Sequence, residues 1–409
     1  MDSTLKEYVV IGAGPAALCA VAKLVASGEV AQQNLVWIDP KFELGAFGTS
    51  LSAGSSVPGN TDVESYMRVI DGIASLIPAC KVPSDTWKTF EISDLEKTAR
   101  GKTCPIKIAA APLKYVSDRL AELVTQIKDT VTAIESLDDE NKPNGPLKVF
   151  LRSGASLRSR RVILATGSEP HTLELPHPLK VVDPNTAFIS SELDALIAKE
   201  TPALAPGSKL RFAVVGSSHS AALAVMNLIK AGVPVKQFMN KPYKFATKQT
   251  APDGTVFTQF DNTGLKGDVA AFTRTLLEGK AGTTSQTQET ETQKSHAALW
   301  SYYIGAGEID PVEIADCTHS VVCIGYTHCD TLTIDKKPLA KFSHDSTSSA
   351  ILSSSSASPA LKGVFGIGIA FPKHVTAPSG ESEFAVGVGK FWSTIDDKML
   401  DFWQCNPSS

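Results

Sequence analysis

The sequence predicts an α/β protein with two Rossmann-like dinucleotide-binding domains, the first of which is discontinuous in the chain. Two stretches predict this fold, because each has a short apolar strand, a glycine turn, a helix and a second apolar strand in that order. One stretch begins at Glu7 and the other at Arg211. The 409 residues are enough for two domains of ordinary size, each with its own core.

The first unit has the residues needed to hold a diphosphate. A strand over residues 7–11 runs into Gly12-Ala13-Gly14-Pro15-Ala16-Ala17, and a helix is predicted over residues 18–26. Gly12 permits a tight turn, Gly14 lets the backbone approach a pyrophosphate, and free amides at the helix start face the phosphates. A strand over residues 34–38 ends in Asp39, which is placed to bind a ribose. The predicted contacts are Gly12, Gly14, Pro15, Ala16, Asp39, Pro40 and Lys41.

The second unit departs from the first at two positions. A strand over residues 211–215 leads into Gly216-Ser217-Ser218-His219-Ser220-Ala221, a helix over residues 222–231 and a strand over residues 233–239. Ser218 replaces the second glycine, and its Cβ is expected to crowd a pyrophosphate, which leaves weak binding or a relic site open. The last strand ends in Asn240-Lys241 without an acid, which favours NADPH over NADH. The predicted contacts are Gly216, Ser218, Ser220, Ala221 and Lys241, with His219 a phosphate neighbour or solvated.

The second turn has another interpretation as a hydrolase motif. Gly216-x-Ser218-x-Ser220 is similar to a nucleophile elbow, in which Ser218 is the nucleophile. Ser220 replaces the last glycine of that motif, and the first unit has no place in a hydrolase fold. We therefore favour the dinucleotide interpretation.

Composition limits the classes of partner. The net charge of -4 and the scattered basic residues argue against nucleic acid, which leaves a small-molecule substrate. No run of about 18 apolar residues predicts a membrane span, and no secretory signal is apparent. Seven cysteines without a regular framework indicate reduced thiols in a cytoplasmic protein. The Cys/His stretch over residues 317–329 matches no zinc spacing, so no metal site is predicted.

Later strand-to-turn junctions predict how the chain returns between the domains. One strand ends in Ala165-Thr166-Gly167, a second spans residues 321–326, and a third contains Gly368. We expect a first domain over residues 1–178 that returns over residues 331–409, with the second domain over residues 179–330 between them. A core helix is expected over residues 112–127, and a final helix is expected to begin at residues 383–387.

This arrangement resembles the flavoproteins with two dinucleotide-binding domains, which include disulfide reductases and the Baeyer–Villiger and N-hydroxylating monooxygenases. The resemblance implies that the first turn binds FAD together with Ala165, Thr166, Gly167 and Gly368, and that the second binds NADPH. It also implies that Asn60 and Thr61 lie along the flavin ring, although residues 57–61 are equally typical of an ordinary loop. His374 is predicted to supply a proton near the flavin, the alternative being an exposed loop histidine. The chain lacks the closely spaced cysteine pair of a disulfide reductase.

We therefore expect a FAD-dependent oxidoreductase, with an NADPH-driven monooxygenase as the leading hypothesis. NADPH is expected to reduce FAD, and the reduced flavin to react with oxygen so that one oxygen atom enters a small organic substrate such as a secondary metabolite. Two other classes stay open. One is a flavin oxidase or dehydrogenase that does not use nicotinamide, which Ser218 favours, and the other is a non-enzymatic nucleotide-sensing protein. The oligomeric state is not predicted.

Overall fold

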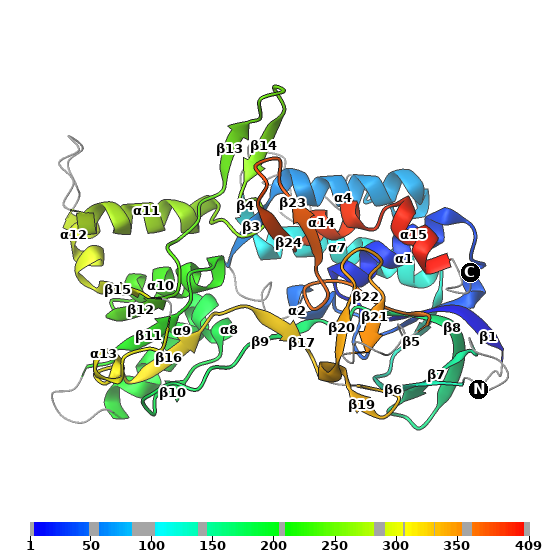
Figure 1. Cartoon of the computed structure of the whole chain (residues 1–409), viewed down its shortest axis with the longest axis horizontal. Coiled ribbons are helices and arrows are strands. Elements are labelled where there is room, and N and C mark those ends of the chain that lie inside the picture. Colours follow the sequence, from blue (N-terminus) through cyan, green and yellow to red (C-terminus); the bar gives the residue numbers. More distant parts are fainter. Residues whose placement is uncertain are drawn as a thin grey trace.

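The computed structural model describes residues 4–48, 57–83, 103–137, 145–203, 209–281, 291–305, 307–330, 332–353 and 362–404. Within these residues two separate β-sheets, each covered by helices, lie one beside the other along the long axis of the molecule (Figure 1). The predicted α/β fold is confirmed.

The larger sheet has nine described strands in the order β19-β18-β6-β7-β8-β1-β2-β5, with β22 beside β8. Its centre is parallel, because β1 pairs in parallel with β2 and β8, β2 with β5, and β8 with β22. The strands are β1 (Leu5–Ile11), β2 (Leu35–Ile38), β5 (Thr125–Ile127), β6 (Val131–Ser136), β7 (Leu147–Leu151), β8 (Ser156–Leu164), β18 (Thr333–Ile334), β19 (Lys337–Pro338) and β22 (Val364–Gly366). Strands from both ends of the chain therefore share one sheet.

The alternation of side chains along β1 separates two cores. Tyr8 and Val10 face a helical layer, whereas Val9 and Ile11 pack against β6, β7 and β18 on the other side. The helical layer consists of α1 (Pro15–Ser27), α4 (Val63–Leu76), α7 (Ile106–Glu122), α14 (Val388–Thr394) and α15 (Asp397–Gln404), with α2 (Gly45–Gly48) nearby (Figure 1). The final helices thus complete a core that the first helix begins.

The smaller sheet is parallel throughout, in the order β10-β16-β11-β12-β15. Its strands are β10 (Lys180–Val181), β11 (Phe212–Val215), β12 (Val235–Met239), β15 (Trp300–Ile304) and β16 (His319–Val322). Phe212 and Val214 face the apolar sides of α10 and its neighbouring helices. The helices of this part are α8 (Pro184–Phe188), α9 (Ser190–Glu200), α10 (His219–Lys230), α11 (Gly267–Ala281), α12 (Glu291–Ala298) and α13 (Pro311–Ile314).

Short antiparallel pairs connect the two sheets or extend from them. β9 (Ser168–Pro170) pairs with β17 (Tyr326–His328) where the chain passes between the sheets (Figure 1). The other pairs are β3 (Pro58–Asp62) with β4 (Thr103–Pro105), β13 (Thr247–Thr250) with β14 (Val256–Gln259), β20 (Phe342–His344) with β21 (Ile351–Ser353), and β23 (Lys373–Thr376) with β24 (Ser382–Ala385). Short 3-10 helices are η1 (Gln32–Asn34), η2 (Pro78–Cys80), η3 (Thr201–Ala203) and η4 (Leu339–Lys341). Every helix in the described ranges is too short or too polar to cross a membrane.

Two predicted helices were wrong in their bounds. The helix expected over residues 112–127 begins at Ile106 and ends at Glu122, and Thr125–Ile127 is instead strand β5 at the sheet edge beside β2. Pro112, which is typical of a helix start, lies inside this helix. Residues 383–385, expected to begin the final helix, belong to β24 because they pair with β23, and the helix begins at Val388.

Truncation of the fully buried Leu113 in α7 is expected to destabilise the fold. Leu113→Ala removes apolar contacts from the helical layer and should lower the free energy of unfolding by about 2–5 kcal/mol. Leu76→Ala is the matched control, because Leu76 is 49% exposed at the end of α4 and should change this value by less than about 0.5 kcal/mol. Equal shifts of the two variants in urea unfolding would contradict the assigned packing.

Candidate functional site

The first glycine turn lies where β1, β2 and β8 end together. Gly12 has a φ of +99°, and its amide donates to the carbonyl oxygen of Ile38 at 2.8 Å. A Cβ on Gly12 would lie 2.2 Å from the carbonyl oxygen of Ala165. Only glycine satisfies both conditions, so the turn closes directly against Ala165-Thr166-Gly167. The structure thus brings together two predicted segments that are about 150 residues apart.

The mouth of α1 is open at Gly14. This residue is the N-cap of α1, with a φ of -73° and a ψ of 177°, a conformation that any residue adopts. A Cβ at Gly14 would meet no atom of the described protein within 4 Å. Pro15 follows as the first helical residue, and the first-turn amides of the helix face this open space. The protein's own packing therefore does not require glycine here, whereas close approach of a phosphate would.

Asp39 is fixed beside this mouth by backbone amides. Its Oδ2 accepts from the amide of Ala13 at 2.9 Å, and its Oδ1 accepts from the amides of Lys41 and Phe42 at 2.8 and 2.7 Å. The carboxylate keeps acceptor capacity on Oδ2. Pro40 and Lys41 are exposed. The structure therefore joins Asp39 to the glycine turn, as its predicted position after the strand requires.

Gly368 approaches the same turn from the C-terminal part of the chain. It has a φ of +96°, and a Cβ there would lie 3.1 Å from the Cβ of Ala16 in α1. The side-chain oxygen of Thr166 is buried without a hydrogen-bond partner among the described residues. The return strand β22 therefore brings a third predicted segment to the mouth of α1.

The second glycine turn repeats the geometry of the first. Gly216 has a φ of +125°, its amide donates to Phe238 at 2.8 Å, and a Cβ would lie 2.2 Å from the carbonyl oxygen of Cys323. In both turns a side chain also donates a hydrogen bond to the carbonyl of the glycine. Trp37 Nε1 donates to the carbonyl of Gly12 at 2.7 Å, and Gln237 Nε2 donates to the carbonyl of Gly216 at 2.8 Å. Two units of unlike sequence thus form the same local structure.

Ser218 occupies the position equivalent to Gly14. It is the N-cap of α10, with a φ of -83° and a ψ of 176°, and it is exposed. Its Oγ donates to the carbonyl oxygen of Cys323 at 3.4 Å, so the hydroxyl turns back toward the protein. A carbonyl is not a general base, so the contacts of Ser218 in the described structure do not form the hydrolase arrangement. Beside it, Ser220 hydrogen-bonds to Tyr326, Ala221 is buried, and Lys241 is exposed just past β12.

Strand β3 lies against the second sheet's helices. The side chain of Val57 belongs to the apolar core of that second part, and Asn60 Nδ2 donates to the carbonyl oxygen of Gly264 at 3.4 Å. Asn60 Oδ1 is buried without a partner among the described residues. Thr61 hydrogen-bonds to the Tyr66 hydroxyl. The predicted flavin contacts Asn60 and Thr61 therefore lie at the seam between the two parts of the molecule.

The ring nitrogens of His219 are shielded from solvent at this seam, although the residue as a whole is half-buried. Both ring nitrogens are shielded from solvent, and neither has a hydrogen-bond partner that satisfies it in the described structure. Burial lowers the pKa of His219 to about 4, with nearby Lys266 acting in the same direction and the backbone of Pro58 opposing it. The ring is therefore neutral at neutral pH. It belongs to the first residue of α10 and lies close to Pro58 of β3.

His374 lies on the exposed hairpin of β23 and β24. Its ring packs edge-on against Phe384 at 4.3 Å, and its Nδ1 lies 3.5 Å from the hydroxyl of Ser382. Both partners belong to its own hairpin. These contacts do not join His374 to either glycine turn, so its proton-supplying role stays a prediction.

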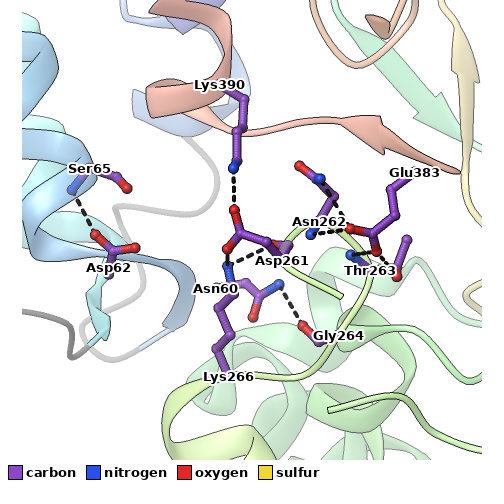
Figure 2. Close-up of polar contacts among 10 residues, drawn as sticks. All are labelled: Asn60, Asp62, Ser65, Asp261, Asn262, Thr263, Gly264, Lys266, Glu383 and Lys390. Carbon is purple, nitrogen blue, oxygen red and sulfur yellow. Dashed lines mark hydrogen bonds and ion pairs between the residues drawn. The ribbon is translucent and has the colours of Figure 1, made fainter. Parts of the chain in front are cut away.

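Sequence reasoning missed a set of polar residues at the seam, shown in Figure 2. Glu383 accepts hydrogen bonds from Asn262 and Thr263, and Asp261 binds Lys266 and Lys390. The partners of Glu383 are about 120 residues away in the chain. No local pattern marks such contacts, because the fold alone brings these segments together.

The burial of His219 predicts a specific pH dependence of stability. Between pH 6.5 and about 4 the unfolded chain binds a proton at this ring and the folded chain does not, so stability falls as the pH falls. The loss should reach about 3 kcal/mol at pH 4. His219→Gln should remove this part of the pH slope in urea unfolding, whereas His374→Gln, at an exposed histidine, should retain it. An unchanged slope in His219→Gln would contradict the burial of the neutral ring.

Comparison with known proteins finds one similar sequence, that of a monooxygenase. No protein-family model matches the chain. The chain is 28% identical over 415 residues to the monooxygenase AgnR1 of Paecilomyces divaricatus, covering 95% of each chain.

Solved structures agree at the level of the fold. The ornithine hydroxylase PvdA of Pseudomonas aeruginosa aligns with a TM-score of 0.56 and 11% identity, covering 98% of this chain and 99% of that one. The ornithine N-hydroxylase KtzI of Kutzneria sp. 744 aligns with a TM-score of 0.51 and 12% identity over 98% and 99% of the two chains. A cyclohexanone monooxygenase aligns with a TM-score of 0.51 and 13% identity over 97% and 86%. The predicted resemblance is thereby confirmed at the level of the fold, which the chain shares with these three enzymes over almost its whole length.

Proposed function

We propose that this protein is a FAD-dependent, NADPH-driven monooxygenase that acts on a small organic substrate. The observation that carries the proposal is the first glycine turn, where Gly14 leaves open space before the amides of α1 and Asp39 stands beside it. The similarity to the monooxygenase AgnR1 over 95% of both chains supports the choice of reaction.

The residues of the first turn fit FAD. The amides at the start of α1 bind the diphosphate, with Gly14 allowing close approach, and the free acceptor position of Asp39 binds a ribose hydroxyl. Asn60 Oδ1 and Thr166 Oγ1 are buried acceptors without protein partners in the described structure, and they offer hydrogen bonds to the flavin part. When bound, the flavin supplies the transfer of electrons to oxygen. The protein's part is to orient the reactants and to exclude water.

The second turn fits NADPH, with less space before its helix than the first turn has. Its backbone matches that of the first turn, and the hydroxyl of Ser218 is turned away toward Cys323, so only its Cβ narrows the mouth. Lys241 is exposed beyond the end of β12, where it offers a charge to a 2′-phosphate. The solved structure of KtzI is described with reduced FAD, NADP+ and L-ornithine, which supports the same pair of cofactors here.

The remaining parts of the proposal concern organisation and location. We assign residues 1–178 and 331–409 to the FAD domain and residues 179–330 to the NADPH domain, in agreement with the strands that share each sheet. In this proposal His374 supplies a proton near the flavin. The six cysteines in the described ranges are free thiols, which is compatible with a cytoplasmic location.

Gly14→Ala tests the FAD site without disturbing the fold. The new methyl group meets no atom of the described residues and the backbone conformation suits alanine, so the free energy of unfolding of the FAD-free protein should change by no more than about 1 kcal/mol. The methyl group would occupy the space of the diphosphate, so the FAD dissociation constant should rise at least about tenfold. The measurement is a fluorescence titration with FAD. Unchanged FAD affinity would show that the diphosphate does not lie at this mouth.

Anaerobic mixing with NADPH tests the reaction class. The yellow flavin of the purified protein should bleach, and Ser218→Gly should lower the NADPH concentration for half-maximal bleaching several-fold, because it removes the Cβ at the mouth. A flavin that binds but is not bleached would favour an oxidase or dehydrogenase that does not use nicotinamide. Protein that neither contains nor gains FAD would favour a nucleotide-sensing role.

A further inference from the structure

A segment of the second part of the molecule bridges to the first part at several points. Residues 259–266, from the last residue of β14 to the start of α11, contact β3, β24 and α14 (Figure 2). Of these elements, β3 carries the predicted flavin contacts Asn60 and Thr61, and α14 is the first of the C-terminal helices. The segment therefore links the part with the second glycine turn to the part with the first.

Glu383 of β24 is the centre of this contact. Its side chain is only 5% exposed. Its Oε2 accepts from the amide and the side-chain Nδ2 of Asn262, both at 3.2 Å. Its Oε1 accepts from the amide of Thr263 at 3.1 Å and from the Thr263 hydroxyl. All four donors come from the bridging segment, so the carboxylate loses all four described hydrogen bonds if the two parts separate.

Asp261 adds a second connection in the same segment. Its carboxylate binds Lys266 Nζ at 2.7 Å within the segment and also binds Lys390 Nζ of α14. Asn60 of β3 reaches the same segment through Gly264. His219 at the start of α10 also lies close to the seam, near Pro58 and Lys266. Glu383 is the most buried carboxylate of the seam among the described residues.

A buried carboxylate of this kind has a strong geometric requirement. Removing it from water is unfavourable unless charge-assisted hydrogen bonds replace the lost water. Two of its four donors are backbone amides, which cannot move without the segment that carries them. Glu383 therefore fixes the segment in one position relative to β24, as a flexible surface ion pair would not.

We propose that Glu383 is a positioning residue that holds the NADPH-binding part against the FAD-binding part in the orientation needed for hydride transfer. This inference rests on the proposed function. In that step a hydride, carrying two electrons, leaves the nicotinamide ring of NADPH and enters the oxidised flavin. NADPH becomes NADP+, and the flavin becomes reduced. Glu383 touches neither reactant and acts through Asn262 and Thr263.

Glu383→Gln is the test variant, because it keeps the shape of the side chain but replaces one acceptor oxygen with an amide donor. Glu381→Gln is the matched control just before the same strand, since the side chain of Glu381 accepts one described hydrogen bond, from Gln259 Nε2 at 3.3 Å, and is less buried. Thr263→Val is an independent variant in the bridging segment. It removes the hydroxyl that donates to Glu383 and keeps the size and branching of the side chain.

Stopped-flow anaerobic reduction of the holoenzyme should separate positioning from general damage. In Glu383→Gln the limiting rate of flavin reduction by NADPH should fall at least about tenfold. Reduction by dithionite and the flavin content should stay as in the wild type, and Glu381→Gln should match the wild type throughout. Thr263→Val should show a smaller loss, and the double variant should lose less than the product of the two single effects.

Hydrogen–deuterium exchange gives a readout that does not depend on activity. The amides of Asn262 and Thr263 should exchange faster in Glu383→Gln than in the wild type and Glu381→Gln. Equal or faster reduction of the flavin in Glu383→Gln, or unchanged exchange of residues 259–266, would overturn the positioning role. A wild-type flavin that NADPH does not bleach would instead refute the proposed function, and the positioning role with it.

Discussion

The structure depends on a backbone contact that occurs twice. In each half of the molecule a glycine amide donates a hydrogen bond to the end of the neighbouring parallel strand. The same glycine lies so close to a carbonyl oxygen at the end of the returning strand that a Cβ on it would clash with that oxygen. Gly12 meets Ala165 in this way, and Gly216 meets Cys323. This contact aligns the ends of three strands, and so it decides where the following helix begins and where its free amides point.

Because the same contact forms both turns, differences between the two sites come from their side chains. Gly14 leaves the mouth of α1 open, whereas Ser218 adds a Cβ at the mouth of α10 and turns its hydroxyl to a carbonyl. After the next strand, Asp39 provides a carboxylate beside the first turn, and Lys241 provides a positive charge near the second. One backbone geometry thus carries a carboxylate at one site and a positive charge at the other.

The seam between the halves has a different physical basis. It combines apolar contact through Val57 with polar contacts through the buried Glu383 and the half-buried Asp261 and Asn60. Buried polar contacts are costly when incomplete, so they select one arrangement of the two halves more sharply than apolar contact alone. The shielded ring of His219 adds to this requirement, because its protonation would place an unpaired charge in the seam.

The sequence by itself determined the two nucleotide-type units, because strand, glycine turn, helix and strand are local patterns whose meaning depends on neighbouring residues. Gly12, Gly14 and Asp39 were predicted on this basis, and the structure brings them together. Local patterns failed at Pro112 and at residues 383–385, where tertiary pairing decided the element. The contacts of Glu383 and the enclosure of the His219 ring nitrogens were not predicted, because their surroundings come from segments remote in the chain. Only the tertiary structure decides such contacts, since burial and hydrogen bonding between distant segments leave no periodic trace along the sequence.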